Sequence, residues 1–219
     1  MKVGTDGVLL GAWADVTARK AVLDMGTGTG LVALMAAQRA EKALVTAVDI
    51  DADAVRQAQE NVASSPYHTR IVVLQGDVRR MFRQDSTPSF DAILCNPPYF
   101  ERALHCPDEA RTTARHNDTL SLDDLARTAS CLLTMDGELS VIHPYDRRED
   151  MIMAAAAYGL FLTREAHVYS LPTKAPKRIL LAFAREGRDA QVETLCVEDA
   201  PGHYNSEYVN LLKNFYLKF

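Results

Sequence analysis

The sequence is poor in cysteine and in positive charge, and it has no long apolar run. Its four cysteines are widely separated, so neither a disulfide framework nor a zinc knuckle is predicted, and we expect reduced thiols. His105, Cys106 and His116 fit no standard ligand spacing, and we predict no metal site. No stretch approaches the roughly 20 apolar residues that span a bilayer, and the start "MKVGTDG" has no apolar signal-peptide core. We therefore expect a soluble, cytoplasmic protein.

The net charge of -5 argues against a protein that coats nucleic acid through bulk positive charge, although a local basic face stays possible. With 219 residues, of which 47% are hydrophobic, the chain can build one sizeable core. We predict a single domain over residues 1–219 and favour a monomer. It would comprise an N-terminal flanking helix within 1–19, a core over 20–200 and a C-terminal helix within 201–219.

Apolar runs of strand length alternate with segments of helical period, which is typical of βαβ units around a mostly parallel sheet. Seven segments read as strands: 20–25, 43–50, 70–77, 90–95, 137–144, 161–171 and 177–185. Four segments between them read as helices: 31–40, 51–65, 121–133 and 147–159, with Ser121 as the N-cap of the third. Only about six residues join the last two strands, too few for a helical crossover, so the final strand should be antiparallel.

A glycine-rich turn joins the first predicted strand to the first helix. The stretch "LDMGTGTG" places Gly26, Gly28 and Gly30 there, which lets a backbone approach a ligand closely. The dinucleotide pattern G-x-G-x-x-G fails at Leu31, and no Gly-Lys-Ser/Thr follows, so nicotinamide and phosphate-loop nucleotides are disfavoured. A tight strand-to-helix connection would also account for this turn by itself.

Acidic residues end the next two strands. Asp49 stands where a carboxylate can accept both hydroxyls of a ribose, and Asp77 ends the third strand within reach of an adenine amino group. Either aspartate alone would more often be a solvated strand end or a helix cap than a ligand contact. Together with the glycine turn, they predict a pocket for an adenosine-containing ligand at the carboxyl edge of the sheet, where open α/β sheets bind ligands.

The motif "NPPY" (Asn96 to Tyr99) follows the fourth strand on the same edge. A Pro-Pro turn that ends a strand explains the prolines but not Asn96 or Tyr99. The order "LDMGTGTG", "AVDID", "QGD" and "NPPY" resembles the Rossmann-like, class I S-adenosylmethionine-dependent methyltransferases that act on amino groups. The resemblance implies an α/β fold with a mostly parallel seven-stranded sheet, an antiparallel final strand and helices on both faces. It also implies S-adenosylmethionine as cofactor.

Carried over position by position, the resemblance implies two groups of site residues. The cofactor group has glycines that wrap the methionine portion, a supporting carboxylate, and acidic and apolar contacts to the adenosine: Gly26, Gly28, Gly30, Asp24, Asp49, Asp77, Ile50 and Val78. In the catalytic group, the Asn96 side-chain oxygen and the Pro97 carbonyl would accept the N–H groups of the target amine. Tyr99 would offer a face on which a flipped base stacks.

The two flanks narrow the choice of amine. "MKVGTDGVLLGAWA" and "YNSEYVNLLKNFYLKF" resemble bacterial tRNA methyltransferases that make N6-methyladenine at position 37 of a valine tRNA. Ordinary helical packing explains the same apolar spacing, and both interpretations can hold. The family pattern carries an additional segment before "MKVGTDG", where this chain departs from it. We predict an adenine-N6 methyltransferase acting on tRNA. The alternatives are a protein glutamine N5-methyltransferase and a non-catalytic module that binds S-adenosylmethionine and RNA.

Basic residues gather in the loops predicted at the carboxyl edge of the sheet. Each cluster alone is typical of a solvated loop, but their convergence predicts a rim that contacts RNA phosphates. The predicted RNA-binding residues are Arg102, Arg111, Arg115, Arg147, Arg148, Lys174, Lys177 and Arg178.

Overall fold

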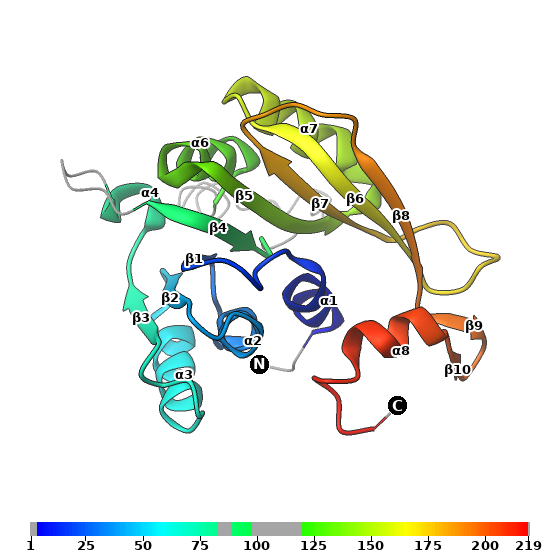
Figure 1. Ribbon diagram of the computed structural model, residues 1–219, viewed down its shortest axis with the longest axis horizontal. Helices are drawn as coiled ribbons and strands as arrows, with labels where there is room; N and C mark the ends of the chain where they lie inside the picture. The colour runs from blue at the N-terminus through cyan, green and yellow to red at the C-terminus, as the bar shows by residue number, and fades with distance from the viewer. Residues whose placement is uncertain (1–3, 83–88, 98–119, 219) are drawn as a thin grey trace, which may run out of the picture.

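The computed structural model describes residues 4–82, 89–97 and 120–218. Its centre is an eight-stranded sheet in the order β3-β2-β1-β4-β5-β7-β6-β8 (Figure 1). The strands are β1 (Ala21–Met25), β2 (Leu44–Asp49), β3 (Ile71–Gln75), β4 (Phe90–Cys95), β5 (Leu133–Pro144), β6 (Phe161–Tyr169), β7 (Arg178–Ala184) and β8 (Gln191–Cys196). Because β2 and β4 flank β1 on opposite sides, the strand order reverses at β1, which is where such sheets bind ligands.

Helices cover both faces of this sheet, with α1 and α2 on one side and α6 and α7 on the other (Figure 1). The first face carries α1 (Thr5–Trp13), α2 (Leu31–Arg39), α3 (Ala52–Ala63) and α8 (Ser206–Leu212). The second carries α4 (Val78–Met81), α6 (Leu122–Leu132) and α7 (Arg148–Ala157), with the short η1 (Tyr145–Arg147) before α7. A small pair, β9 (Glu198–Ala200) and β10 (His203–Tyr204), precedes α8.

Alternation along each strand divides the core into two layers. On β1, Val22 faces the α1 and α2 layer, while Leu23 and Met25 face the α6 and α7 layer. Both faces of the central strands are therefore apolar, as expected for parallel strands that helices cover on both sides. Phe183, on β7, is fully buried within the second layer.

The α/β class and all seven predicted strands are confirmed, with ends that shift by a few residues. β7 pairs antiparallel with both β5 and β6, as the short connection before it predicted. Ser121 caps α6, where its hydroxyl accepts the Asp124 N–H at 3.0 Å.

One feature differs from the sequence prediction. β8 adds an eighth strand, parallel to β6 at the sheet edge, so the antiparallel β7 is not the final strand. Gln191 to Thr194 are all exposed, and that segment therefore lacks the apolar run from which the other strands were predicted. The C-terminal helix α8 covers Ser206–Leu212, inside the segment predicted to hold it.

Candidate functional site

The turn after β1 is built from glycines in conformations that other residues rarely adopt. Gly26, Gly28 and Gly30 have φ values of 76°, 57° and 84°, in the left-handed region that favours glycine. The N–H groups of Gly26 and Thr27 both donate to the Val48 carbonyl at 2.9 Å, which fixes the turn against the end of β2. A Cβ atom at Gly26 would have no atom within 4 Å, so this turn borders open space.

Asp24 supports the turn from inside the protein. One oxygen of its buried carboxyl group accepts the Thr27 hydroxyl at 2.6 Å and the Ala33 N–H at 3.0 Å. It thereby joins the turn to the first residues of α2. Burial raises the pKa of Asp24 from 3.8 to about 7, although both hydrogen bonds act in the opposite direction.

Asp49 ends β2 beside the same turn. One of its carboxylate oxygens accepts the Gly28 N–H at 2.7 Å, and the other accepts the Asp51 N–H at 3.0 Å. A carboxylate offers about four acceptor positions, so this half-buried group keeps the capacity to accept two more hydroxyl protons. The following Ile50 is 47% exposed and presents an apolar side chain at this edge.

Asp77, which follows β3, makes more hydrogen bonds within the protein than its position in the sequence indicated. It caps α4 and accepts two hydrogen bonds from the Arg79 guanidinium, at 2.8 and 2.9 Å. These bonds lower the pKa of Asp77. Arg79 also reaches Asp124 at 3.3 Å, which ties this corner to α6. The neighbouring Val78 is buried and packs in the core layer below β3 and β4.

Asn96 and Pro97 follow β4 directly beside the glycine turn. The register pairs Met25 of β1 with Cys95 of β4 and Cys95 with Val141 of β5, so Gly26 and Asn96 leave neighbouring strands at the same level. Asn96 is half-buried and Pro97 is buried. The structure thus brings the predicted cofactor turn and the predicted amine acceptors together. Tyr99 lies outside the described residues.

The predicted basic rim is only partly described. Arg102, Arg111 and Arg115 lie outside the described residues. Lys174 and Lys177 are exposed in the β6–β7 connection. Arg147 pairs with Asp150, Arg148 pairs with Glu149 and with the buried Glu165, and Arg178 pairs with Asp6 at 2.9 Å. The three described arginines of this rim are therefore paired with acidic side chains, whereas the two lysines form no ion pair with the part of the chain that the structure describes.

Three residues near the site were not predicted from the sequence. Asn61 of α3 donates to the Thr29 carbonyl at 2.9 Å and ties α3 to the glycine turn. Gly7 and Asp6 of α1 lie close to Asn96 and Arg178, respectively. The apolar spacing of residues 8–13 indicated a packed helix, but no local pattern shows which loop its first turn meets.

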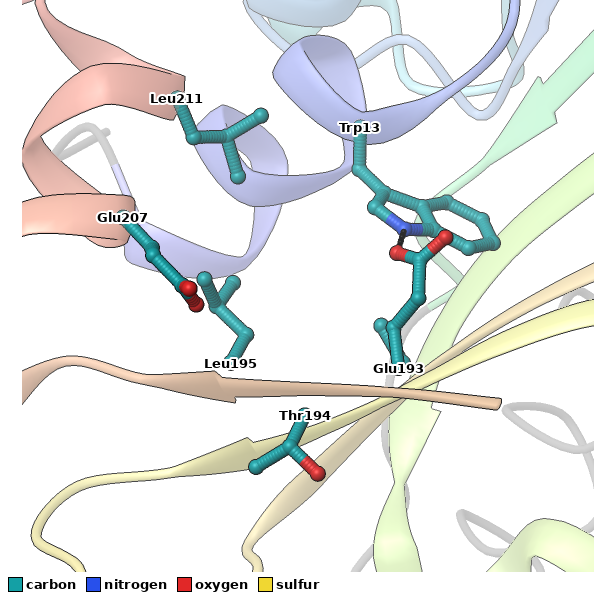
Figure 2. Close-up of a pocket in the computed structure, with 7 residues that line it drawn as sticks. Trp13, Glu193, Thr194, Leu195, Glu207 and Leu211 are labelled. Carbon is teal, nitrogen blue, oxygen red and sulfur yellow. Dashed lines mark hydrogen bonds between the residues drawn. The ribbon is translucent and has the colours of Figure 1, made fainter. Parts of the chain in front are cut away.

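A separate groove of about 390 Å³ lies between α1, β8 and α8 (Figure 2). Trp13, Glu193 and Leu211 contribute to its lining, and no predicted site residue does.

Within residues 4–82, 89–97 and 120–218, no cluster of three or more His, Cys, Asp or Glu side chains could hold a metal ion. The same residues contain no helix long and apolar enough to cross a membrane.

Comparison with solved structures supports the fold. A protein from Agrobacterium tumefaciens described as a predicted O-methyltransferase superimposes with a TM-score of 0.73 over 95% of this chain and 96% of its own, at 23% identity. A putative RNA methyltransferase from Pyrococcus horikoshii superimposes with a TM-score of 0.56 over 81% of each chain, at 19% identity. Both likenesses show a methyltransferase-type fold.

Sequence comparison gives the family. The family model "Methyltransferase small domain" matches residues 4–156. The tRNA1(Val) (adenine(37)-N6)-methyltransferase of Phocaeicola vulgatus is 49% identical over 99% of this chain and 91% of its own length. The protein of the same name from Tolumonas auensis is 40% identical over 100% of this chain and 91% of its own length. The chain therefore belongs to the methyltransferase small domain family of S-adenosylmethionine-dependent enzymes, and within it to the tRNA1(Val) (adenine(37)-N6)-methyltransferases.

Proposed function

We propose that this enzyme transfers a methyl group from S-adenosylmethionine to the exocyclic N6 of an adenine in tRNA, at position 37 of a valine tRNA. One observation carries the proposal: Asn96 and Pro97 emerge beside an open glycine turn at the reversal point of the sheet. An amine acceptor and a cofactor turn on adjacent strand ends are what methyl transfer to nitrogen requires. The activity in the names of relatives that are 40–49% identical supports the choice of amine and of RNA.

The residues at this edge fit S-adenosylmethionine. The turn leaves open space at Gly26, where a side chain would otherwise project. Asp49 keeps acceptor capacity toward the ribose hydroxyls, and Ile50 presents an apolar surface for the adenine. When bound, the cofactor supplies a methyl group already activated by its sulfonium. We propose that Gly26, Gly28 and Gly30 hold the methionine portion while Asp24 fixes the turn from below.

For Asp77 and Val78 we propose a narrower role at the adenine. The Asp77 carboxylate already accepts three hydrogen bonds from Arg79, two from its guanidinium and one from its backbone N–H, which leaves about one of its four acceptor positions for an amino N–H. Arg79 would then hold the carboxylate ionised and correctly oriented. Val78 is buried beneath this corner, so it would support the adenine site mainly from the core side.

The chain's own residues act mainly on the target amine. The nitrogen lone pair of an adenine amino group is delocalised into the ring, which makes it a poor nucleophile. We propose that the Asn96 side-chain oxygen and the Pro97 carbonyl each accept one N–H, which turns the lone pair out of the ring and toward the methyl group. The same acceptors stabilise the positive charge that develops on nitrogen. Tyr99, from the same motif, would stack on the extruded base.

We propose that tRNA phosphates contact the basic rim around this edge. Lys174 and Lys177 are exposed, and neither forms an ion pair with another described residue. Arg147 and Arg148 would contribute while partly neutralised by Asp150, Glu149 and Glu165. Arg102, Arg111 and Arg115 belong to the rim by sequence position.

A tRNA substrate would place the enzyme in the cytoplasm. We also propose that it acts as a monomer with a single domain, since turn, acceptors and rim come from one chain and one sheet.

The test uses purified enzyme, S-adenosylmethionine labelled in its methyl group, and two acceptors in parallel: bulk tRNA and a release-factor protein. We expect label in tRNA, recovered as N6-methyladenosine after nucleoside analysis, and its loss when adenine 37 of the valine tRNA is replaced by guanine. Label in the release factor instead would show glutamine methylation. Binding of cofactor and tRNA without transfer would indicate a non-catalytic module. Either result contradicts the proposal.

A further inference from the structure

The first turn of α1 packs directly on the residues of the proposed active site. A Cβ atom placed on the buried Gly7 would lie 3.3 Å from Leu31 Cδ2, 3.7 Å from Val32 Cγ2 and 3.9 Å from Asn96 Nδ2. Leu31 and Val32 begin the helix that follows the glycine turn. One turn of α1 therefore lies beside both halves of the site, the cofactor turn and the amine acceptor. A side chain at position 7 would crowd the Leu31 side chain first.

Several interactions anchor the C-terminal end of α1. The Trp13 indole N–H donates to Glu193 at 2.8 Å, and Figure 2 shows the two side chains facing each other above β8. The Arg164 guanidinium stacks on the Trp13 ring at 3.8 Å and donates to the Trp13 carbonyl at 3.0 Å. Arg39 donates to the carbonyls of Gly11 and Ala14 at 2.8 and 2.6 Å. The last turn of α1 is thus fixed to α2, β6 and β8.

The N-terminal end of α1 is held by fewer polar interactions. Gly4 is the N-cap residue and offers no side-chain cap. Within the described residues, one ion pair joins the first turn to the sheet, in which Arg178 Nε donates to Asp6 Oδ2 at 2.9 Å. Arg178 is a rigid partner, because it begins β7 and pairs there with Pro144 of β5 and Val168 of β6. Both side chains are partly shielded, with exposed fractions of 23% for Asp6 and 34% for Arg178.

We propose that Asp6 and Arg178 are positioning residues for methyl transfer: their ion pair holds the first turn of α1 against Asn96 and so limits the orientations of the Asn96 amide. This inference rests on the proposed function of Asn96. The Asn96 oxygen must point at the amine while charge develops, and an amide in any other orientation would have to be reoriented in each turnover. The Asn96 side-chain atom nearest to the Cβ position of Gly7 is the amide nitrogen. In this proposal the helix limits the nitrogen side of the amide.

A direct role of Arg178 on tRNA makes different predictions from a role through Asp6. If Arg178 binds a phosphate, its neutralisation weakens tRNA binding and lowers the salt dependence, whereas loss of the Asp6 charge does not weaken binding. If Arg178 acts through Asp6, neutralising either partner has the same consequence, and neutralising both adds nothing further. A double-mutant cycle therefore separates the two roles.

The experiment compares the wild type with Asp6→Asn, Arg178→Gln, the double variant and Arg178→Lys. Single-turnover methyl transfer is measured at saturating cofactor and tRNA. We expect each single variant to be slower by about tenfold, since small misplacements of reacting groups cost this much or more. The double variant should equal the single ones, and Arg178→Lys should recover part of the rate because it keeps the charge but not the fork geometry. The salt slope of tRNA binding should be unchanged in Asp6→Asn.

Glu193→Ala is the matched control, because it removes a hydrogen bond from the opposite end of the same helix. It should lower thermal stability and leave the transfer rate unaltered. The side-chain amide resonances of Asn96, observed by NMR, give a readout that needs no activity. They should shift or broaden in Asp6→Asn and Arg178→Gln and stay in place in Glu193→Ala. An inactive wild type would contradict the proposed function alone, and the resonances would still test the positioning.

Two results would overturn the inference. The first is a normal transfer rate together with unchanged Asn96 resonances in Asp6→Asn. The second is additivity, in which the double variant loses the product of the two single losses and Arg178→Gln alone changes the salt slope. That pattern would assign Arg178 to the RNA rim and leave α1 as a packing element.

Discussion

At the scale of single residues, Asn96 carries the most specific chemical expectation. Asn96→Ala removes an acceptor that matters mainly as charge develops on the amine. Cofactor affinity should therefore stay near normal while single-turnover methyl transfer falls by about 100- to 1,000-fold, the effect of losing one preorganised group. Calorimetry and rapid-quench kinetics measure the two quantities separately. A variant that keeps its transfer rate would remove Asn96 from the mechanism.

Asp49 should determine cofactor affinity. Its carboxylate borders the open turn, and a buried ribose without this acceptor loses charge-assisted hydrogen bonds of about 1.5–3 kcal/mol each. Asp49→Ala should weaken S-adenosylmethionine binding at least about tenfold in a calorimetric titration. Asp53→Ala is the control, since it removes the same charge from an exposed position on α3. Equal affinities of the two variants would mean that the ribose lies elsewhere.

Asp24 should make stability depend on pH in a direction opposite to most carboxyl groups. Burial raises its pKa from 3.8 to about 7, so between these values the folded protein keeps a proton that the unfolded chain releases. Stability from this residue is complete below about pH 4 and falls as pH rises toward 7, by about 1.4 kcal/mol per unit.

The isosteric variant Asp24→Asn isolates this effect. An amide oxygen can still accept the bonds from Thr27 and Ala33, but it does not titrate. In urea titrations at several pH values, we expect the variant to gain stability over the wild type as pH increases from 4 to 7. Parallel profiles for the two proteins would show that Asp24 titrates normally in the fold.

At the scale of elements, local patterns predicted what depends on local sequence. The apolar runs of β1 to β7, the cap at Ser121 and the antiparallel β7 follow from residues that are adjacent in the chain. β8 escaped prediction because an edge strand pairs through its backbone, and its exposed side chains need no apolar pattern. The common location of the glycine turn, Asp49 and Asn96 could also be predicted, because the carboxyl ends of neighbouring parallel strands lie at the same edge of a sheet.

Pairings between distant elements could not be predicted in this way. Arg178 looked like a solvated cation beside two lysines, and only the fold brings Asp6 of α1 to it. Asp77 likewise looked like an open acceptor, although Arg79 two residues later could have indicated the bidentate pair. Ion pairs depend on side-chain placement across the whole fold, which composition and periodicity do not encode.

The cap of α6 provides a test at this scale. The Ser121 hydroxyl accepts the Asp124 N–H, and replacing such a cap by alanine costs about 1 kcal/mol. Ser121→Ala should lose that amount in urea unfolding and keep normal cofactor affinity. Ser64→Ala is the control, because its hydroxyl at the C-cap of α3 donates back to the Glu60 carbonyl and caps no N–H group. An equal loss in both variants would argue against a specific role of the cap.

At the scale of the whole molecule, the protein is acidic and so is the tRNA that we expect it to bind. The distribution of the charged residues removes this conflict. The net charge of -5 is spread over the chain, while Lys174 and Lys177 stand exposed at the carboxyl edge. Screening limits each charge to a distance of about 8–10 Å in ordinary buffers. A phosphate at this edge therefore responds to the nearby lysines more than to distant acidic groups.

The two lysines should consequently control how tRNA binding depends on salt. Each phosphate contact releases a condensed counterion, so removing one lowers the slope of log K against log salt by about 0.7–0.9. Lys174→Ala and Lys177→Ala should each weaken tRNA binding, flatten this slope and leave the transfer rate at saturating tRNA unchanged. Lys42→Ala makes the same charge change at the opposite edge, just before β2, and should alter neither quantity. If all three variants lose affinity equally, the effect comes from net charge, and tRNA does not approach the site across this edge.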